Sequence, residues 1–217
     1  MNTIVISRLV GSEAGAIAKR LADSLEYDLV DKEILEGTLR QYGVTRFGKL
    51  YTSPPNIWDL TNSKNLEVVS MLNDTMRALA QRGRAVILAR GGYVTLNPYY
   101  DVLKVRIQAP YTLRVDRVMS REKIDSRTEA EDRVTADDSA RMKFVKRFYG
   151  QKWHDATSFD LVLNTDVIPP ETATDWIAQA VDLLKKQKEK KNSHSAQNIK
   201  VDPLLLGAID EALLRRV

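Results

Sequence analysis

The sequence has 217 residues, of which 43% are hydrophobic and 29% are charged, a composition typical of a soluble globular domain. Its formal net charge is +4, and the run KKQKEKK at residues 185–191 carries all of that excess. Because the basic charge is confined to one short run, we do not expect nucleic acid as a partner. The absence of cysteine excludes thiolate catalysis, and no apolar run approaches the ~18 residues of a membrane span. We therefore expect a cytoplasmic protein with no membrane association.

Strand and helix patterns alternate along most of the chain. Short apolar runs predict five strands, at residues 3–7, 27–31, 85–89, 101–109 and 159–165. Helical spacing of apolar residues predicts helices at residues 14–25, 32–42, 66–83, 111–150 and 169–186. Alternating strands and helices with wholly apolar central strands are typical of a parallel sheet covered on both faces. The sequence therefore predicts an α/β fold of three layers.

Three further segments do not follow this alternation. Residues 43–65 contain two adjacent prolines and scattered aromatic residues, which predicts an irregular excursion. Residues 185–203 are polar and predict a basic linker, and residues 204–217 (LLLGAIDEALLRRV) predict a separate amphipathic helix. A helix this short is marginal in water by itself. We expect it to dock on a second subunit, giving a homodimer, or on its own core.

The candidate site lies where strands lead into helices, because ligands of parallel sheets bind at the carboxyl ends of strands. This rule selects residues 8–16, residues 90–92 and the end of the run 101–109. The first segment resembles a phosphate loop, whose glycines allow backbone N–H groups to surround a phosphate at a helix N-terminus. The expected contacts to the nucleotide are Arg8, Gly11, Ser12 and Gly15.

Four successive segments together are similar to the cytidylate kinase-like family. They are TIVISRLVGSEAG from residue 3, YDLVDKEIL from residue 27, AVILARGGYVTL from residue 85 and RVDRVMSREKIDSRTEAEDRVTADDSAR from residue 114. The resemblance implies a P-loop nucleotide kinase fold over residues 1–184, with a helical lid at about residues 111–150. It also implies a phosphotransferase that uses ATP and Mg²⁺ and acts on a nucleoside monophosphate such as CMP or on another small acceptor.

The chemistry of phosphoryl transfer explains why arginines matter here. The reaction needs positive charge around the transferred group, and arginine contacts phosphate oxygens with two N–H groups at once. Helical spacing places Arg114, Arg117 and Arg121 on one helix face. The resemblance implies three catalytic residues, namely Arg117, Arg141 and Asp138, with Asp138 orienting Arg141 or contacting the acceptor base. The expected acceptor contacts are Asp31, Arg90 and Arg114, and no metal ligand is expected from the protein.

The phosphate loop departs from this pattern. Ala14 and Gly15 stand where a typical loop has its Lys and its Ser or Thr, and Glu13 stands where the family has glycine. A carboxylate at about 4 Å from a phosphate costs roughly 4 kcal/mol at an effective dielectric near 20. Glu13 therefore points away, holds a metal ion or marks a lost ATP site. Two alternatives follow: a nucleotide-binding regulatory protein without catalysis, and an interaction module that uses residues 204–217.

Overall fold

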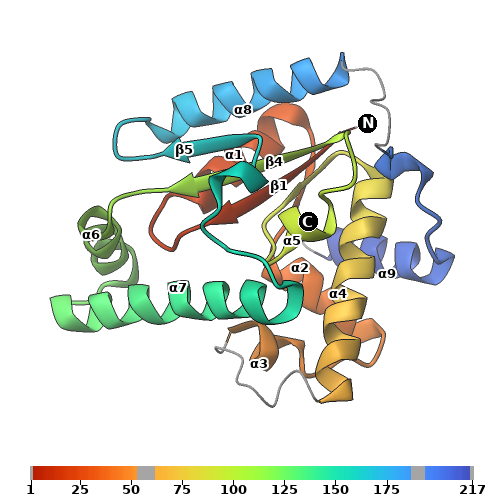
Figure 1. Cartoon of the computed structure of the whole chain (residues 1–217), viewed down its shortest axis with the longest axis horizontal. Coiled ribbons are helices and arrows are strands. Elements are labelled where there is room, and N and C mark those ends of the chain that lie inside the picture. The colour runs from red at the N-terminus through yellow and green to blue at the C-terminus, as the bar shows by residue number, and fades with distance from the viewer. Residues whose placement is uncertain (1, 53–61, 187–193, 216–217) are drawn as a thin grey trace.

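A five-stranded parallel sheet forms the centre of the protein in the computed structural model, which describes residues 2–52, 62–186 and 194–215 (Figure 1). The spatial order is β2-β3-β1-β4-β5, and every neighbouring pair is parallel. The strands are β1 (Thr3–Arg8), β2 (Asp28–Val30), β3 (Ala85–Ile87), β4 (Val102–Gln108) and β5 (Leu161–Asn164). Each lies within the predicted range or one residue beyond it, so the predicted fold class is confirmed.

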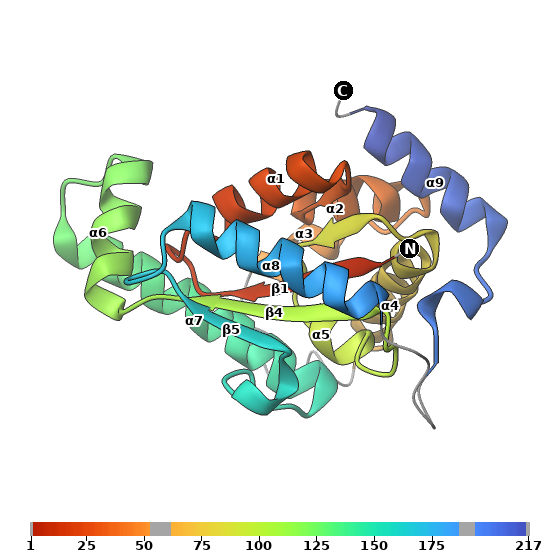
Figure 2. The ribbon, with the colours of Figure 1, turned by 90° about the horizontal axis from the view of Figure 1, so that it is seen from above.

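Helices cover both faces of this sheet, and alternate residues of β1 show the two faces. Ile4 and Ile6 belong to the core under α1 (Ala14–Leu25) and α8 (Pro170–Lys185). Val5 belongs to the opposite core, which a second set of helices covers. This set includes α2 (Lys32–Gln41), α4 (Ser63–Arg82), α5 (Gly92–Thr95), α7 (Arg127–Tyr149) and α9 (Pro203–Leu214). Figure 2 shows α1 and α8 side by side over the sheet.

The strand order determines where a ligand can bind. β1 lies between β3 and β4 in the sheet. The strand order reverses at β1, so the connections that leave the strands on its two sides run in opposite directions. Such a switch point opens a crevice at the carboxyl end of the central strand. The loop between β1 and α1 lies at this point, and it is the loop that the sequence identified.

The predicted helix at residues 111–150 is two helices. α6 (Tyr111–Glu122) ends at Lys123, whose φ of 55° is left-handed, and the Ser126 side chain accepts a hydrogen bond from the Glu129 N–H to begin α7. A small apolar core joins both helices to the loop after β1; its members are Val10, Val115, Val118, Ala130 and Val134. The predicted lid is therefore a helical hairpin that packs directly on the loop (Figure 1).

The excursion predicted at residues 43–65 is partly helical. Residues Phe47–Thr52 form α3, and the rings of Phe47 and Tyr51 are buried with centroids 4.7 Å apart. α4 begins within the same segment, at Ser63, after the Asn62 side chain accepts the Lys64 N–H. The prediction missed α3 because its burial depends on contacts with distant residues. Trp58 and the rest of 53–61 lie outside the described residues.

The C-terminal helix docks on its own chain. Leu205, Ile209 and Ala212 of α9 are buried in the same core as residues of α2 and α4. The predicted linker is partly ordered, since Ala196–Asn198 forms a 3-10 turn; residues 187–193 lie outside the described part of the chain. Docking on the chain's own core was one of the two expected outcomes, and the homodimer stays a prediction.

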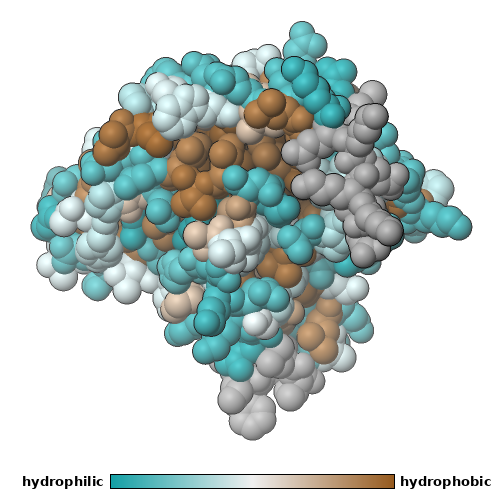
Figure 3. Space-filling model, turned by 45° about the horizontal axis from the view of Figure 1, so that its top comes forward, coloured by the Kyte–Doolittle hydropathy of each residue, from teal (hydrophilic) through white to brown (hydrophobic). Residues whose placement is uncertain are grey.

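Most of the exposed large apolar side chains lie outside α9. Val162 in β5, Val167 in the connection that follows and Leu183 in α8 are exposed. Hydrophobic residues also gather on the face seen in Figure 3. On α9 the exposed large apolar residues are Leu204 and Leu214. None of the described helices is long and apolar enough to cross a membrane.

Replacing the fully buried Ile209 should show that α9 belongs to the core. We expect Ile209→Ala to lower the free energy of unfolding by about 2–5 kcal/mol, because it leaves a cavity between α2, α4 and α9. Urea unfolding measures this change. The control is Leu214→Ala on the same helix, where the residue is 72% exposed and the change should stay within about 0.5 kcal/mol. Equal effects of the two variants would contradict the docking.

Candidate functional site

The loop between β1 and α1 has one position that requires glycine. Gly11 has a φ of +74°, and a Cβ there would lie 2.6 Å from the backbone carbonyl oxygen of Arg114. Both the left-handed backbone and this close approach exclude a side chain. Within the loop, the Ser12 hydroxyl donates to the Leu9 carbonyl oxygen at 2.7 Å. The loop is therefore a tight turn closed by its own hydrogen bonds.

A cleft of about 390 Å³ lies over this loop. Residues 8–16 line one side of it, so all four predicted nucleotide contacts (Arg8, Gly11, Ser12 and Gly15) are in its lining. The helical hairpin supplies the other side, with Arg121, Arg133, Asp137 and Arg141. Of these, Arg133 and Asp137 were missed by the sequence analysis, and Arg121 was recognised only as a member of a helix face. The cleft is within the size range of small-molecule sites.

Arg114 supports the loop from below. Its side chain is buried and donates to the carbonyl oxygens of Ala109 and Val10, each at 3.1 Å. Its Nη1 also lies 2.8 Å from Oδ2 of Asp138. The structure thus places Arg114 outside the cleft lining, which differs from the expected contact with an acceptor.

Arg117 joins the loop to the turn after β5. Its Nη1 donates to the Thr165 hydroxyl at 2.9 Å and its Nη2 to the Thr165 carbonyl at 2.8 Å. Nη1 also donates to the Gly11 carbonyl at 3.4 Å, and the Thr165 hydroxyl donates to the Ser12 carbonyl at 3.2 Å. The guanidinium was expected to reach phosphates. In this structure it positions the loop instead.

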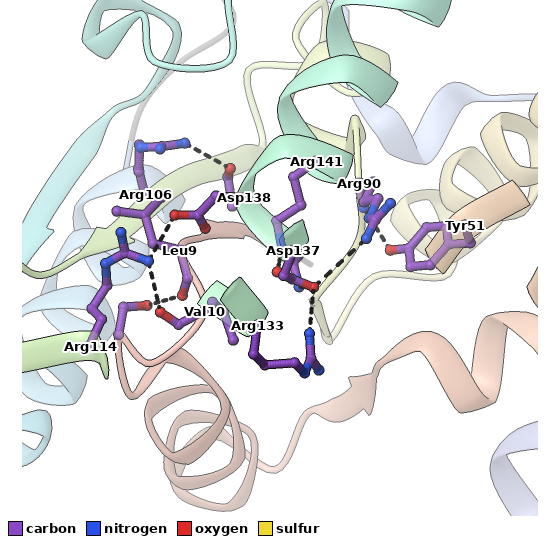
Figure 4. Close-up of polar contacts among 12 residues, drawn as sticks. Leu9, Val10, Tyr51, Arg90, Arg106, Arg114, Arg133, Asp137, Asp138 and Arg141 are labelled. Atoms are coloured by element: carbon purple, nitrogen blue, oxygen red, sulfur yellow. Dashed lines mark hydrogen bonds and ion pairs between the residues drawn. The ribbon is translucent and has the colours of Figure 1, made fainter. Parts of the chain in front are cut away.

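Asp137 is the carboxylate that pairs with Arg141. It accepts hydrogen bonds from Nε and Nη2 of Arg141, and its Oδ1 lies 3.9 Å from Arg90 Nη2 and 4.0 Å from Arg133 Nη1 (Figure 4). The sequence analysis assigned this role to Asp138, which pairs with Arg114 instead. Neighbouring residues of an α-helix point about 100° apart, so the two aspartates face different partners. The pairing with Arg141 therefore belongs to Asp137, and the contact of Asp138 with an acceptor base stays a prediction.

Arg90 is the most buried cation of the cluster. Its side chain is 4% exposed and lies over the rings of Tyr51 and Phe144, with Cζ 4.9 Å and 5.9 Å from their centroids. Its backbone N–H donates to the Tyr51 hydroxyl at 2.7 Å. Its buried Nε and Nη1 have no hydrogen-bond partner among the described residues. Buried charged donors are costly unless they are paired, so these atoms indicate an anionic ligand.

The electrostatics of the cluster agree with this reading. Burial and the neighbouring Arg141 lower the pKa of both Arg8 and Arg90 to about 10, which still leaves each group charged at neutral pH. Burial raises the pKa of Asp137, but the nearby arginines, Arg141 first, outweigh it and hold the pKa below its ordinary value. The cluster therefore contains more positive than negative charge.

The turn after Arg90 leaves no room for a side chain. Gly91 has a φ of +74°, and a Cβ there would lie 2.2 Å from Cε2 of Tyr149. The Tyr149 hydroxyl donates to Oδ1 of Asn73 at 2.7 Å, and the Thr95 hydroxyl donates to the same atom at 2.9 Å. An acidic side chain at position 91 does not fit this packing.

Two carboxylates remain to be placed. Asp31 caps α2 by accepting the N–H groups of Glu33 and Ile34, and it is not part of the cleft lining. Glu13 has a left-handed φ of 61°, precedes α1 and lines the cleft. The described residues contain no group of three His, Cys, Asp or Glu side chains that could hold a metal ion, and the Ser12 hydroxyl is bonded within the loop. These residues do not fit a protein-built Mg²⁺ site.

Removing the negative charge of Asp137 tests the cluster. Asp137→Asn should lower the free energy of unfolding by about 3 kcal/mol, the lower end for a broken buried ion pair, since 13% of the side chain is exposed. Millimolar inorganic phosphate should stabilise this variant more than the unchanged protein, because the anion replaces the lost charge. Thermal unfolding with and without phosphate measures both effects. Asp116→Asn, in an exposed pair with Arg127, is the control.

Comparison with known proteins agrees with this geometry. Residues 3–167 match the cytidylate kinase-like family. The cytidylate kinase of Methanosarcina mazei is 27% identical over 184 residues, covering 83% of this chain and 97% of that protein. The cytidylate kinase of Ignicoccus hospitalis is 28% identical over 181 residues, covering 82% and 97%.

Solved structures share the fold. An uncharacterised protein from Eubacterium ventriosum has a TM-score of 0.66 and 22% identity, covering 84% of this chain and 99% of that one. Shikimate kinase from Bacteroides thetaiotaomicron has a TM-score of 0.52 and 13% identity, covering 83% and 98%. At these identities the structures establish the fold alone. Because the family match spans most of the sequence, from β1 through β5, the chain belongs to the cytidylate kinase-like family.

Proposed function

We propose that the protein transfers the γ-phosphoryl group of ATP to a nucleoside monophosphate, with CMP as the first candidate acceptor. Two neighbouring features carry the proposal, and Asp137 joins them, since it lines the first and lies 3.9 Å from Arg90 of the second. One is the cleft over residues 8–16, and the other is the buried Arg90 with its unpartnered Nε and Nη1. A donor and an acceptor phosphate must be adjacent for this reaction. The curated relatives with this family's sequence are cytidylate kinases.

The donor phosphates would bind at the loop. The loop residues 9–15 contain no lysine or arginine, so positive charge there must come from the helical hairpin. Arg121 and Arg133 line the same cleft and are about half exposed, which leaves them able to turn toward a ligand. Arg114 and Arg117 hold the loop in shape, and we assign them, with Asp138, to positioning.

The acceptor phosphate would bind at Arg90, beside Arg141. An oxygen of that phosphate attacks the γ-phosphorus, the bond from the γ-phosphorus to the β–γ bridging oxygen breaks, and ADP leaves. Arg141 lines the cleft and stabilises the charge of the transferred group, while Asp137 fixes its orientation. Mg²⁺ would enter with the ATP phosphates, and no step is assigned to it here.

Glu13 supports one alternative, a nucleotide-binding regulatory protein. Its carboxylate lines the donor cleft, where negative charge opposes phosphate binding. A turnover assay with ATP and a panel of CMP, UMP, dCMP, AMP and GMP distinguishes the two functions. Formation of ADP and a nucleoside diphosphate supports the kinase. Thermal stabilisation by ATP without turnover supports the regulatory protein. If ATP gives neither turnover nor stabilisation, both functions are contradicted. The panel also addresses base choice.

Gly11→Val should abolish binding of ATP. At about a hundredfold excess over Kd, ATP should stabilise the folded protein by about 2.7 kcal/mol, which raises Tm by roughly 5–10 °C at this chain length. The added side chain would collide with the Arg114 carbonyl and distort the loop. Thermal unfolding with and without ATP measures the shift. Gly207→Ala in α9, with nothing within 4 Å of the added Cβ, is the matched control and should keep the full shift.

Arg90→Ala should weaken acceptor binding selectively. Loss of a charged hydrogen bond is worth about 1.5–3 kcal/mol, so the KM for the acceptor should rise by about 10- to 100-fold with the KM for ATP unchanged. Arg141→Ala should lower kcat and kcat/KM together, because Arg141 contacts the transferred group. Steady-state kinetics at varied ATP and CMP measures both variants. Equal effects of Arg90→Ala on the two KM values would contradict the acceptor assignment.

A further inference from the structure

We infer that the C-terminal segment, residues 194–215, positions the acceptor side of the site by holding α2 against α4. The segment lies beyond residue 167, where the match to the family ends. The family match therefore assigns no role to it. The tests of this inference that measure KM and kcat rest on the proposed function, whereas the test that measures hydrogen exchange does not.

The segment is anchored at its beginning by a buried carboxylate. Asp101, 6% exposed and just before β4, accepts the Ser195 hydroxyl at 2.7 Å and the Ala196 N–H at 2.8 Å. The Tyr100 N–H donates to the His194 carbonyl at 3.1 Å. A charged acceptor that receives two hydrogen bonds in a buried place fixes the chain direction strongly. The segment therefore enters the molecule at one defined point.

α9 then bridges two helices of the core. Its buried face (Leu205, Ile209 and Ala212) shares a core with Ile34, Leu35 and Leu39 of α2 and with Val68, Val69, Leu72 and Met76 of α4. Polar contacts join it to the last residue of each helix. Gln41 donates to Glu211 at 3.2 Å, and Nε of Arg82 donates to Asp210 at 3.1 Å. Figure 2 shows α9 running along the edge of this pair.

The two bridged helices carry the surroundings of Arg90. The chain from α2 continues through α3, whose Tyr51 contacts Arg90, and returns in α4, whose Asn73 binds Tyr149 beside Gly91. If α2 could move away from α4, only a fraction of the molecules would have a formed acceptor site, and the apparent Kd would rise by the inverse of that fraction. With α9 docked, the formed site is the populated one. Movement during turnover is then confined to the helical hairpin.

A disulfide between α2 and α9 tests whether the helix stays docked. An added Cβ at Gly37 lies 3.7 Å from Cβ of Ala212, within the range of natural disulfides, and the chain has no other cysteine. In Gly37→Cys/Ala212→Cys, the oxidised and reduced enzymes should have the same kcat and the same KM for CMP to within about twofold. A loss of activity of about tenfold or more on oxidation would mean that α9 must leave α2, which overturns the inference.

Weakening the docking of α9 is the converse of the disulfide test. Ile209→Ala should raise the KM for CMP by about fivefold and leave the KM for ATP unchanged. A fivefold rise corresponds to a formed acceptor site in about one fifth of the molecules. Ile209→Val should retain the original value, and so should Leu214→Ala, whose residue is exposed. Oxidising Ile209→Ala in the double-cysteine background should restore the KM for CMP. No restoration, or an equal rise in both KM values, overturns a positioning role.

Hydrogen exchange separates this inference from the proposed function. Amides of α2 should exchange faster in Ile209→Ala and return to the original rates when the disulfide forms. If no nucleotide in the panel is phosphorylated, the proposed kinase is wrong, whereas this exchange pattern still decides whether α9 fixes α2. Unchanged exchange of α2 in Ile209→Ala overturns the inference even in an active kinase.

Discussion

Positive charge gathered at one end of the sheet is the constraint on which the rest of this structure depends. Arg90, Arg133 and Arg141 all approach the carboxylate of Asp137, and Arg141 lowers the pKa of Arg8 nearby. Like charges at about 4 Å repel by roughly 4 kcal/mol in such surroundings. The folded state tolerates them because apolar packing holds α7 and the turn after β3 in place. An anionic ligand would relieve the repulsion, which links the stability of this region to its chemistry.

The loop after β1 is held by side chains of other elements that bind its backbone carbonyls. Arg114 binds the Val10 carbonyl, and Thr165 binds the Ser12 carbonyl. Because the C=O and N–H of one trans peptide unit point in opposite directions, the N–H groups of Gly11 and Glu13 point away from these supports. The loop thus turns these N–H groups away from its supports, although Ala14 and Gly15 stand where a typical phosphate loop has its Lys and its Ser or Thr. Its cations come from the helical hairpin.

The sequence selected several of the residues that the structure brings together, and it failed where the choice depended on distance. It selected Arg8 and Arg141, which line the cleft, and Arg90, which is buried beside them. It could not distinguish Asp137 from Asp138, since both are within one helical turn of Arg141 and their partners come from other elements. It could not identify Tyr51 either, because no local pattern reports that a ring lies against an arginine 39 residues away.

The five strands, the helices around them and the loop at residues 8–16 were determined by the sequence itself, because apolar periodicity and glycine positions are local properties. Tertiary structure alone decided three things: the burial of α3, the exclusion of a side chain at Gly91 by Tyr149, and the docking of α9 on α2 and α4. An apolar helix face shows that a segment must pack, but not against which partner. That choice depends on the shape of the surface left by the rest of the fold.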